Sequence, residues 1–586
     1  MTLPDALAEI DAIFDRFADR KIAPGLVYGV VAGGDLIHSR GIGTLTTMGE
    51  SRPDADSVFR IASMTKSFTA AAVLLLRDEG RLRLDDPVGE WVPELADLPP
   101  MTADSPPITL DHLLTMSAGF PTDDPWGDRQ QGLDLAAFSS FLAAHPSIAW
   151  PSGTHFVYSN LGYGILGRVV TSASGTEYRD FVRERLLVPL GMTATTFDRE
   201  DVPPDRLALG YVRRDDAWLE EPIDPYGALA SMGGIFTSVR DLARWVGGLA
   251  DAFPPRDDPD DDHPLRRASR REMQEVHRPF DPEVTWPSAD APPSVLVPGY
   301  GYGVFTSSDL RYGRIVGHGG GYPGFGSHMR WHPASGFGVI AFGNSRYAPL
   351  IEPLRDALRL LLDAEPSKIR RVNPWPATLA ARTVVEGLLA SWDEEAAASL
   401  FAMNIDLDEP IAIRRAAIEG IRDVHGALRP DETAKPESFS PAHLAWWMDG
   451  ERGRVRVEIL MSPERPPRLQ ALTLTSVPEP PAVLAAIAAR LSDLLAQPGA
   501  TLPEDILLAP SADRSGVERA LRAAEARFGP VALGRPTGGD GLKVATWALS
   551  GPRGDLSLEL ESDGAGGPLT RVAFVPAPME PPVLAD

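Results

Sequence analysis

The chain has 586 residues, with 56 lysine and arginine residues against 81 aspartate and glutamate residues, and a formal net charge of −25 at pH 7. A chain this acidic repels nucleic-acid phosphates and anionic membrane surfaces, so we expect no nucleic-acid partner. Cysteine is absent, which excludes disulfides, thiolate catalysis and cysteine-ligated zinc. No run approaches the ~20 apolar residues of a membrane span. The first residues show neither the basic segment nor the cleavage site of a secretory signal, so we expect a cytoplasmic protein.

The first 365 residues predict one domain that combines a sheet with helices. Apolar residues at helical spacing from Leu3 to Phe17 predict a helix, and residues 25–34 and 35–43 predict two strands joined by a turn. Further helices are expected at 68–76 and 135–144, and further strands at 302–307, 313–320, 326–333 and 336–344. Strands at both ends with helices between them predict one sheet built from both termini.

The remaining residues predict a linker and a duplicated module. Residues 366–376 hold three prolines and predict the linker. After it, GERGRVRVEIL from Gly450 matches GPRGDLSLELE from Gly551, each preceded by a tryptophan, Trp447 or Trp547. We therefore predict two small tandem α+β modules, at 377–480 and 481–586. Neither contains a cluster of histidine, serine and acid, so we expect structural, substrate-gating or interaction modules.

One lysine invites a chemical explanation. The chain has five lysines, and Lys66 follows Ser63 by three residues in an apolar segment. If this segment is helical, the two side chains lie one turn apart on one face. Arginine stays protonated in proteins, whereas a desolvated lysine can lose its proton and activate a serine. The alternative is a surface lysine beside a capping serine.

Two further motifs carry polar groups suited to catalysis. Tyr158 and Asn160 lie in FVYSNLGYGILG, at a predicted junction between a loop and a helix. A tyrosine there can relay a proton and an asparagine can orient a substrate amide; the alternative is a packed aromatic ring beside a helix cap. His318, Gly319 and Gly320 follow an apolar strand, where the glycines let a substrate approach the backbone. The alternative here is a glycine-rich hairpin with an incidental histidine.

Taken in order, Ser-x-x-Lys, Tyr-x-Asn and His-x-Gly resemble the motifs of the penicillin-recognising serine hydrolases. The resemblance is closest to the class C β-lactamase-like branch, which includes D-aminopeptidases, D,D-carboxypeptidases and carboxylesterases. The segments VFRIASMTKSFTA, ITLDHLLTMSAGF, SMGGIFTSVRDLARW and IVGHGGGYPGFGS look like that family too, so the resemblance covers roughly residues 5–362. It implies an α+β fold, a β-lactamase-like antiparallel sheet flanked by helices, with a helical subdomain and Ser63 at a helix N-terminus between the two.

The resemblance also implies a role for each residue of the motifs. Ser63 would be the nucleophile that forms an acyl-enzyme, Lys66 would lower its pKa, and Tyr158 would be the general base or acid. Whether Lys66 or Tyr158 takes the first proton stays open; an anionic Tyr158 would need a pKa pulled down from its ordinary ~10 by Lys66. Substrate binding and the oxyanion hole would use Asn160, Gly320 and the backbone N–H groups of Ser63 and Gly321.

His318 departs from the family pattern, since the β-lactamases and penicillin-binding enzymes usually carry lysine there. A mostly neutral histidine holds a substrate carboxylate less firmly. The sequence therefore favours a D-aminopeptidase-like or esterase-like hydrolase of a small amide, a peptide with D-residues or an ester. The alternative enzyme is a D,D-carboxypeptidase or β-lactamase. In the segment after SAGF, Asp123 and Asp124 beside Trp126 would hold a substrate amine, or would form a solvated acidic loop.

A hypothesis from another class is a catalytically inactive binding protein on the same scaffold. His328 and His332 are four residues apart, but on a strand they do not share a metal-binding face, so we expect neither metal nor cofactor. A small molecule or short peptide is the expected substrate. A homo-oligomer is compatible with the sequence.

Overall fold

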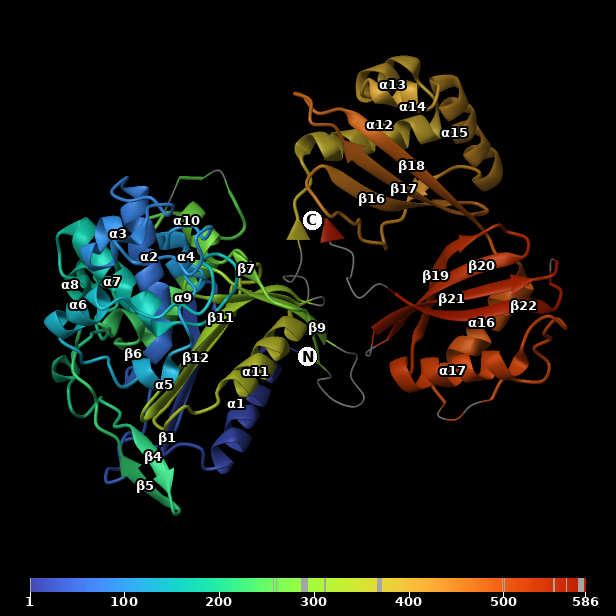
Figure 1. Cartoon of the computed structure of the whole chain (residues 1–586). Coiled ribbons are helices and arrows are strands. Elements are labelled where there is room, and N and C mark those ends of the chain that lie inside the picture. Colours follow the sequence, from blue (N-terminus) through green and yellow to red (C-terminus); the bar gives the residue numbers. More distant parts are fainter. Residues whose placement is uncertain are drawn as a thin grey trace. The chain divides into compact units, whose positions relative to one another are not determined.

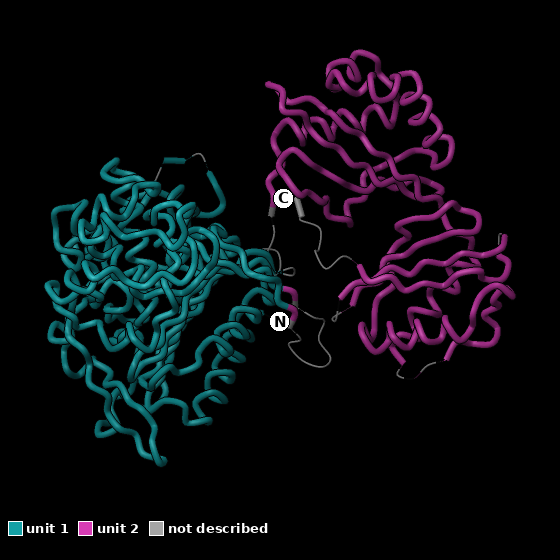
Figure 2. The backbone as a smooth tube through the Cα atoms, viewed as in Figure 1, with its two compact units in different colours: residues 1–283, 296–369 teal, residues 284–295, 370–586 magenta. Residues whose placement is uncertain are grey.

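The protein is described here by a computed structural model. It covers residues 2–256, 258, 259, 261–285, 294–309, 312–365, 371–497, 499, 501–551, 554–564, 566–577, 584 and 585. The chain divides into two compact units, residues 1–283 with 296–369, and residues 284–295 with 370–586 (Figure 2). Across the part of the chain that is described, no helix is both long and apolar enough to cross a membrane.

An antiparallel sheet joins the two ends of the first unit (Figure 1). In the described residues its order is β2 (Asp35–Gly43), β1 (Gly25–Ala32), β13 (Phe337–Gly343), β12 (Phe325–His332), β11 (Gly313–Tyr322), β10 (Phe305–Asp309), β9 (Ser294–Tyr300) and β7 (Arg278–Pro279), with β8 (Glu283–Thr285) paired to β9. Tyr28 of β1 lies opposite Ala341 of β13. The N-terminal hairpin therefore extends the C-terminal strands, and the predicted sheet built from both termini is confirmed.

One face of this sheet is covered by α1 (Leu3–Asp19) and α11 (Ile351–Ala364). Successive residues of a strand point to opposite faces, and Tyr28 and Val30 of β1 pack with these two helices. The ring of Phe14 stacks on the ring of Tyr28 with centroids 3.8 Å apart. Both side chains are fully buried, so this stack anchors α1 to the sheet.

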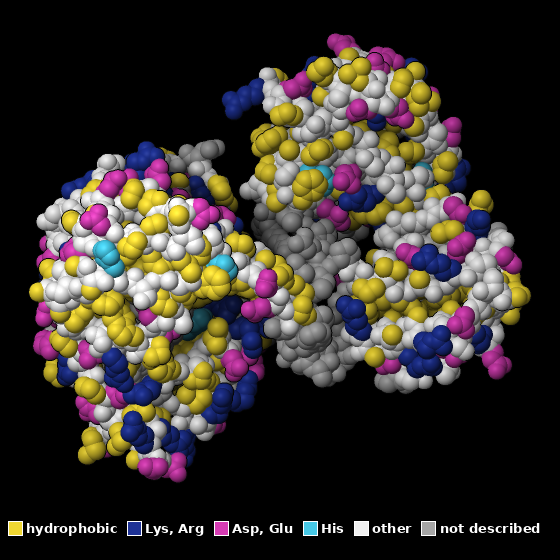
Figure 3. Space-filling view, viewed as in Figure 1, with side chains coloured by type: hydrophobic (Ala, Val, Ile, Leu, Met, Phe, Trp, Pro, Cys, Tyr) yellow, Lys and Arg dark blue, Asp and Glu magenta, His cyan; other side chains and the backbone are white. Residues whose placement is uncertain are grey.

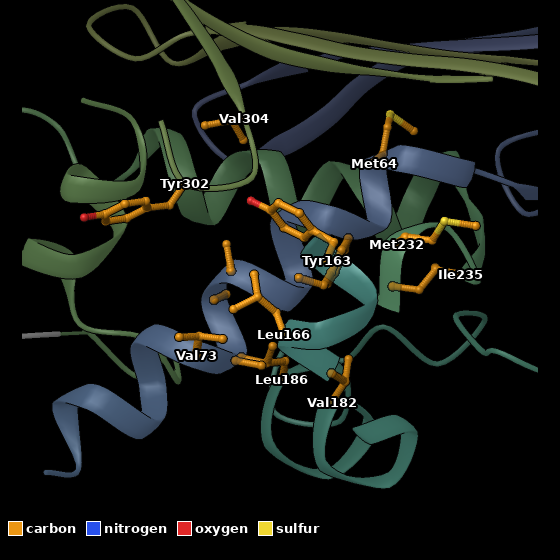
Figure 4. Close-up of a cluster of buried hydrophobic side chains, with 14 of the residues drawn as sticks. Met64, Val73, Tyr163, Leu166, Val182, Leu186, Met232, Ile235, Tyr302 and Val304 are labelled. Carbon is orange, nitrogen blue, oxygen red and sulfur yellow. The ribbon is translucent and has the colours of Figure 1, made fainter. Parts of the chain in front are cut away.

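The other face is covered by α2 (Thr65–Asp78), α9 (Val239–Ala250) and a helical subdomain. Figure 4 shows part of this core, where Val73 of α2 lies close to Leu166 and Leu186. The subdomain's further elements are α3 (Val88–Trp91), α4 (Leu110–Leu114), α5 (Asp124–Gly127), α6 (Leu135–Ala143), α7 (Asn160–Ser174), α8 (Tyr178–Val182) and α10 (Arg267–Met273), with the short turns η1 (Ala62–Met64), η2 (Pro93–Leu95), η3 (Arg183–Leu187), η4 (Arg199–Asp201) and η5 (Ala230–Met232). Two small ribbons pair β3 (Val58–Arg60) with β6 (Phe236–Ser238), and β4 (Tyr211–Arg214) with β5 (Ala217–Glu220).

The second unit contains two four-stranded antiparallel sheets, each with its own helices and hydrophobic core. The first set is α12 (Pro376–Ala390), α13 (Glu394–Leu400), α14 (Asn404–Asp408), α15 (Ile411–His425), β15 (Arg429–Pro430), β16 (His443–Gly450), β17 (Gly453–Met461) and β18 (Leu469–Pro478). The second set is α16 (Ala482–Leu495), α17 (Arg514–Phe528), β19 (Ala532–Gly539), β20 (Val544–Gly551), β21 (Gly554–Ser562) and β22 (Leu569–Pro576).

The register of these sheets corrects one detail of the predicted duplication. Trp446 lies opposite Val457 in the first sheet, and Trp547 lies opposite Leu558 in the second. Trp446, and not Trp447, is therefore the counterpart of Trp547. Trp446 and Trp547 are both buried in their cores. Trp447 points to the other face of β16, where the guanidinium of Arg454 lies 3.8 Å from its ring centroid.

The fold class, an α+β domain of the β-lactamase type followed by small sheet modules, is confirmed. Residues 366–370 of the predicted linker lie outside the described residues. Its remainder includes β14 (Arg371–Val372), which pairs in parallel with β23 (Leu584–Ala585). The boundaries at 377–480 and 481–586 stay a prediction.

The Phe14 and Tyr28 stack gives a stability prediction. Replacing Phe14 by alanine leaves a cavity between α1 and β1, and we expect the free energy of unfolding to fall by about 3–5 kcal/mol. Urea unfolding followed by circular dichroism measures it. Leu135→Ala, at a largely exposed helix position, is the control and should change little. A loss of the same small size in both variants would contradict the anchoring role of Phe14.

Candidate active site

Ser63 lies in η1, the short turn that joins β3 to α2. From Ser57 to Leu76 every residue is buried except Ser63, which keeps part of its surface exposed. The preceding residue, Ala62, has a φ of +47°, a left-handed conformation that is strained for a residue with a side chain. The backbone therefore turns sharply at this point and presents the Ser63 hydroxyl at the start of α2.

Lys66 lies one helical turn after Ser63 and is completely buried. Its Nζ donates to Ser63 Oγ at 3.0 Å, to Asn160 Oδ1 at 2.7 Å and to the Met232 carbonyl oxygen at 2.8 Å. Burial lowers the pKa of Lys66 from 10.5 to about 8, although the nearby carboxylates oppose this change. A substantial fraction of Lys66 is thus neutral under mildly alkaline conditions and can accept a proton from Ser63.

Asn160 begins α7 and is held there by the two predicted aspartates. Asp123 accepts hydrogen bonds from the backbone N–H groups of Asn160 and Leu161, at 2.7 and 2.8 Å. Asp124 Oδ1 accepts from Asn160 Nδ2 at 2.7 Å, which fixes the Asn160 carbonyl oxygen toward Lys66. The structure thus brings both carboxylates to the site with protein groups as their partners. Their predicted contact with a substrate amine stays a prediction.

The Tyr158 ring faces the ammonium group of Lys66, with the ring centroid 4.9 Å from Nζ. Burial raises the pKa of Tyr158 well above its ordinary value of 10, and the neighbouring Ser63 hydroxyl opposes this only in part. Tyr158 is therefore a protonated phenol at neutral pH, and the lowered pKa that an anionic role would require is not found in the resting site.

His318 lies in the middle of β11 and is buried. Its Nδ1 lies 2.5 Å from the Gly319 carbonyl oxygen and its Nε2 lies 3.5 Å from the Tyr300 hydroxyl. Because Nδ1 faces a carbonyl oxygen it carries the proton, which leaves Nε2 as the acceptor. Burial, reinforced by the charge of Lys66, lowers the pKa of His318 to about 3. His318 is therefore neutral and supplies no fixed positive charge.

Gly320 brings β11 against the chain just before η1, the turn that carries Ser63, and Gly321 lies against Tyr347. A Cβ atom at Gly320 would clash with the carbonyl oxygen of Ile61, and one at Gly321 would clash with the ring of Tyr347. Ser327 of the next strand also donates to the Ile61 carbonyl oxygen at 2.8 Å. The strand thus approaches the chain just before Ser63 more closely than any side chain would permit, as an oxyanion hole shared between the two segments requires.

Several groups at this site were not predicted from the sequence. The Met232 carbonyl oxygen, in the SMGG segment, accepts a hydrogen bond from Lys66. Because this contact uses the backbone, no pattern of side chains predicts it. Phe305 packs against the rings of Tyr158 and His318, and Phe156 and Phe280 pack against Phe305 and against each other. Phe156 precedes Tyr158 by two residues, which is a signal available in the sequence. Phe280 and Phe305 come from other elements and have none.

Comparison with known proteins places this site in a family. The family model described as Beta-lactamase matches residues 10–364. Beta-lactamase-like protein 2 of Dictyostelium discoideum is 29% identical over 257 residues, 42% of this chain and 46% of that protein. Protein flp of Staphylococcus aureus (strain COL) is 26% identical over 368 residues, 60% of this chain and 66% of that protein. This chain thus spans less than two thirds of the length of either curated relative.

A solved structure resembles the fold of almost the whole chain. The octameric penicillin-binding protein homologue from Pyrococcus abyssi superposes with a TM-score of 0.53 and 18% sequence identity. The match covers 97% of this chain and 98% of that one, so the likeness of fold extends beyond the first unit to the small sheet modules.

The close approach at Gly320 gives a testable prediction. We expect Gly320→Ala to lower kcat/KM toward an ester substrate by about 100-fold, because a shift of the strand by about an ångström misplaces the reacting groups. Gly162→Ala is the matched control, since a Cβ there would meet only ordinary contacts, 3.7 Å or more from its neighbours. Circular dichroism would show that both variants fold. Equal activity in the Gly320→Ala and Gly162→Ala variants would show that the close approach of Gly320 to Ile61 is not needed for activity.

Proposed function

The chain belongs to the Beta-lactamase family, whose members are serine hydrolases, and from this premise we propose that it hydrolyses its substrate through an acyl-enzyme on Ser63. The observation that carries the proposal is the contact of 3.0 Å between Ser63 Oγ and Lys66 Nζ. A serine is a weak nucleophile until a base takes its proton. Lys66, with its pKa lowered to about 8, is such a base.

The geometry supports a division of labour between Lys66 and Tyr158. Neutral Lys66 takes the proton of Ser63 as Oγ forms a bond to the substrate carbonyl carbon. Protonated Tyr158 gives its proton to the leaving group as the bond to that group breaks, and the proton on Lys66 then restores Tyr158. A water molecule attacks the acyl-enzyme by the reverse sequence, which releases the acid and frees Ser63.

The backbone N–H groups of Ser63 and Gly321 are our candidates for the oxyanion hole. Donors of this kind are each worth about 3 kcal/mol of barrier. The packing of β11 against the nucleophile turn supports this assignment, because Gly320 touches Ile61 through the backbone. Asn160, held by Asp124 and bonded to Lys66, is placed to orient Lys66 and to meet a substrate carbonyl.

The proposed substrate is a small amide, a peptide with D-residues or an ester, as a D-aminopeptidase-like or esterase-like enzyme would use. Neutral His318 supports this choice over a D,D-carboxypeptidase or β-lactamase, whose substrates carry a carboxylate that a cation would hold. The buried ammonium of Lys66 is already engaged by three acceptors. Neither Lys66 nor His318, the basic residues of the three motifs, therefore offers a free positive charge that could bind a substrate carboxylate.

The nucleophile is tested by trapping the acyl-enzyme. The protein is mixed with a p-nitrophenyl acyl ester, quenched within seconds and measured by intact mass, and we expect an acyl adduct that maps to Ser63. Ser63→Ala should fold, release no p-nitrophenol above background and carry no adduct. Equal activity of the two proteins would refute the proposal. The absence of both adduct and turnover with esters and D-aminoacyl amides would favour an inactive binding protein.

The assignment of Lys66 as the base predicts a pH dependence. Among Lys66, Tyr158 and His318, only Lys66 has a pKa near neutrality, about 8. Because the neutral amine is the active form, kcat/KM should rise with pH and level off above about 8. Lys66→Arg, which stays protonated, should lose about 10²–10⁴-fold at every pH. A profile that falls through this range would show that the ammonium form is the active one.

A further inference from the structure

Aromatic rings gather on one flank of the candidate active site. We call Phe156, Phe280, Tyr300 and Phe305 the aromatic wall. The ring of Phe305 lies parallel to that of Tyr158 with centroids 6.4 Å apart, and 5.2 Å from the ring of His318. The ring centroid of Phe156 lies 4.5 Å from that of Phe280 and 5.4 Å from that of Tyr300. The ring centroids of Tyr300 and Phe305 are 4.9 Å apart. The wall thus adjoins two of the proposed catalytic residues.

Four separate elements build the wall. Phe156 precedes α7, Phe280 follows β7, Tyr300 ends β9 and Phe305 begins β10. Tyr300 is completely buried, while the three phenylalanines keep part of their surface exposed. A packed core does not require three partly exposed rings in one contiguous group, one of which faces Tyr158. Apolar surface that is left exposed and grouped in this way is typical of a binding site.

The wall lies on the side from which a leaving group departs, an argument that rests on the proposed function. The Tyr158 ring lies 4.9 Å from Lys66 Nζ, which contacts Ser63 Oγ, and burial keeps the phenol protonated, so under the proposed function it is the donor for the leaving group. A general acid must lie within hydrogen-bond reach of the atom that it protonates. The leaving atom would therefore lie beside the Tyr158 hydroxyl, and the rest of the leaving group would extend toward Phe305, which faces the Tyr158 ring, and the other rings of the wall.

The charges on this flank favour an uncharged leaving group. His318 is neutral, and its Nε2 lies near the hydroxyl of Tyr300, a member of the wall. A carboxylate or sulfonate placed among apolar rings loses its hydration without a partner, which is costly. An aromatic group instead gains contact with the faces and edges of the rings.

We propose that the aromatic wall is the leaving-group subsite, and that it selects substrates whose leaving group is an uncharged aromatic or bulky apolar alcohol or amine. Phe280 is the specificity-determining residue best suited to a test, because it contacts the other rings from a segment outside the catalytic motifs. It touches neither Ser63 nor Lys66 in any recorded contact within the described chain, so its replacement leaves the proposed acylation machinery in place.

The test compares esters that share one acyl group. Phenyl acetate, 4-sulfophenyl acetate and methyl acetate are hydrolysed by the enzyme, and each kcat/KM is divided by the ester's rate with hydroxide to remove its intrinsic reactivity. We expect phenyl acetate to be preferred over both others. A shared deacylation step gives similar kcat values, so the preference should appear in kcat/KM.

Variants of Phe280 make the assignment specific. Phe280→Ala should lower kcat/KM for phenyl acetate by about three- to tenfold, the loss expected for an aromatic contact, while methyl acetate changes little. Phe280→Lys should reduce the preference for phenyl acetate over 4-sulfophenyl acetate, or reverse it. Phe141→Ala is the matched control, because its half-buried ring packs on Trp126 and not on the aromatic wall.

Each outcome decides between the two proposals. Turnover of all three esters without a leaving-group preference, unchanged in Phe280→Ala, would overturn the subsite and leave the serine hydrolase standing. A preference for the sulfonated ester would also overturn it, and would point to Arg278, whose buried Nε has no hydrogen-bond partner among the described residues. No acyl adduct on Ser63 with any ester would overturn both.

Discussion

The burial of one ammonium group, that of Lys66, constrains the arrangement of the first unit. A cation removed from water costs several kcal/mol unless hydrogen-bond acceptors surround it. Here the three acceptors come from three places in the chain, η1, the start of α7 and η5. These three segments must converge for the charge to be tolerated, so the contacts of Lys66 also hold the helical subdomain against α2.

The surroundings of this ammonium group are divided by charge. Toward α5 and α7 lie Asp123 and Asp124, which raise the pKa of Lys66 and hold Asn160 in place. On its other sides the rings of Tyr158 and Tyr163 lie 4.9 and 5.8 Å from Nζ, and burial lowers the pKa of Lys66. The carboxylates thus favour the charged form of Lys66, and burial favours the neutral form. The pKa of about 8 results from this balance.

Sequence reasoning predicted the features that depend on spacing or on strand pattern. Ser63 and Lys66, three residues apart on a helix, and the sheet that joins both termini are of this kind. It missed features that depend on distant segments, such as the Met232 carbonyl oxygen and Phe280, because nothing local distinguishes them. The protonation state of Tyr158 was left open for the same reason, since burial by other elements sets its pKa. The pairing of Trp447 with Trp547 was one residue out of register: the match of Gly450 with Gly551 already aligns Trp446 with Trp547, and a shift of one residue in a strand reverses the face.

The pairing of β1 with β13 has a consequence for how the protein is made. Leu26 needs Gly343 as its partner, so β1 leaves the ribosome long before the strand that completes its hydrogen bonds. Until then the hairpin of β1 and β2 has an open edge, and β11 is absent from its place beside η1. Such distant pairing slows folding and exposes strand edges. The sheet and the candidate site beside it are therefore completed only when the first unit is almost wholly synthesised, and chaperones that shield strand edges should matter most during that interval.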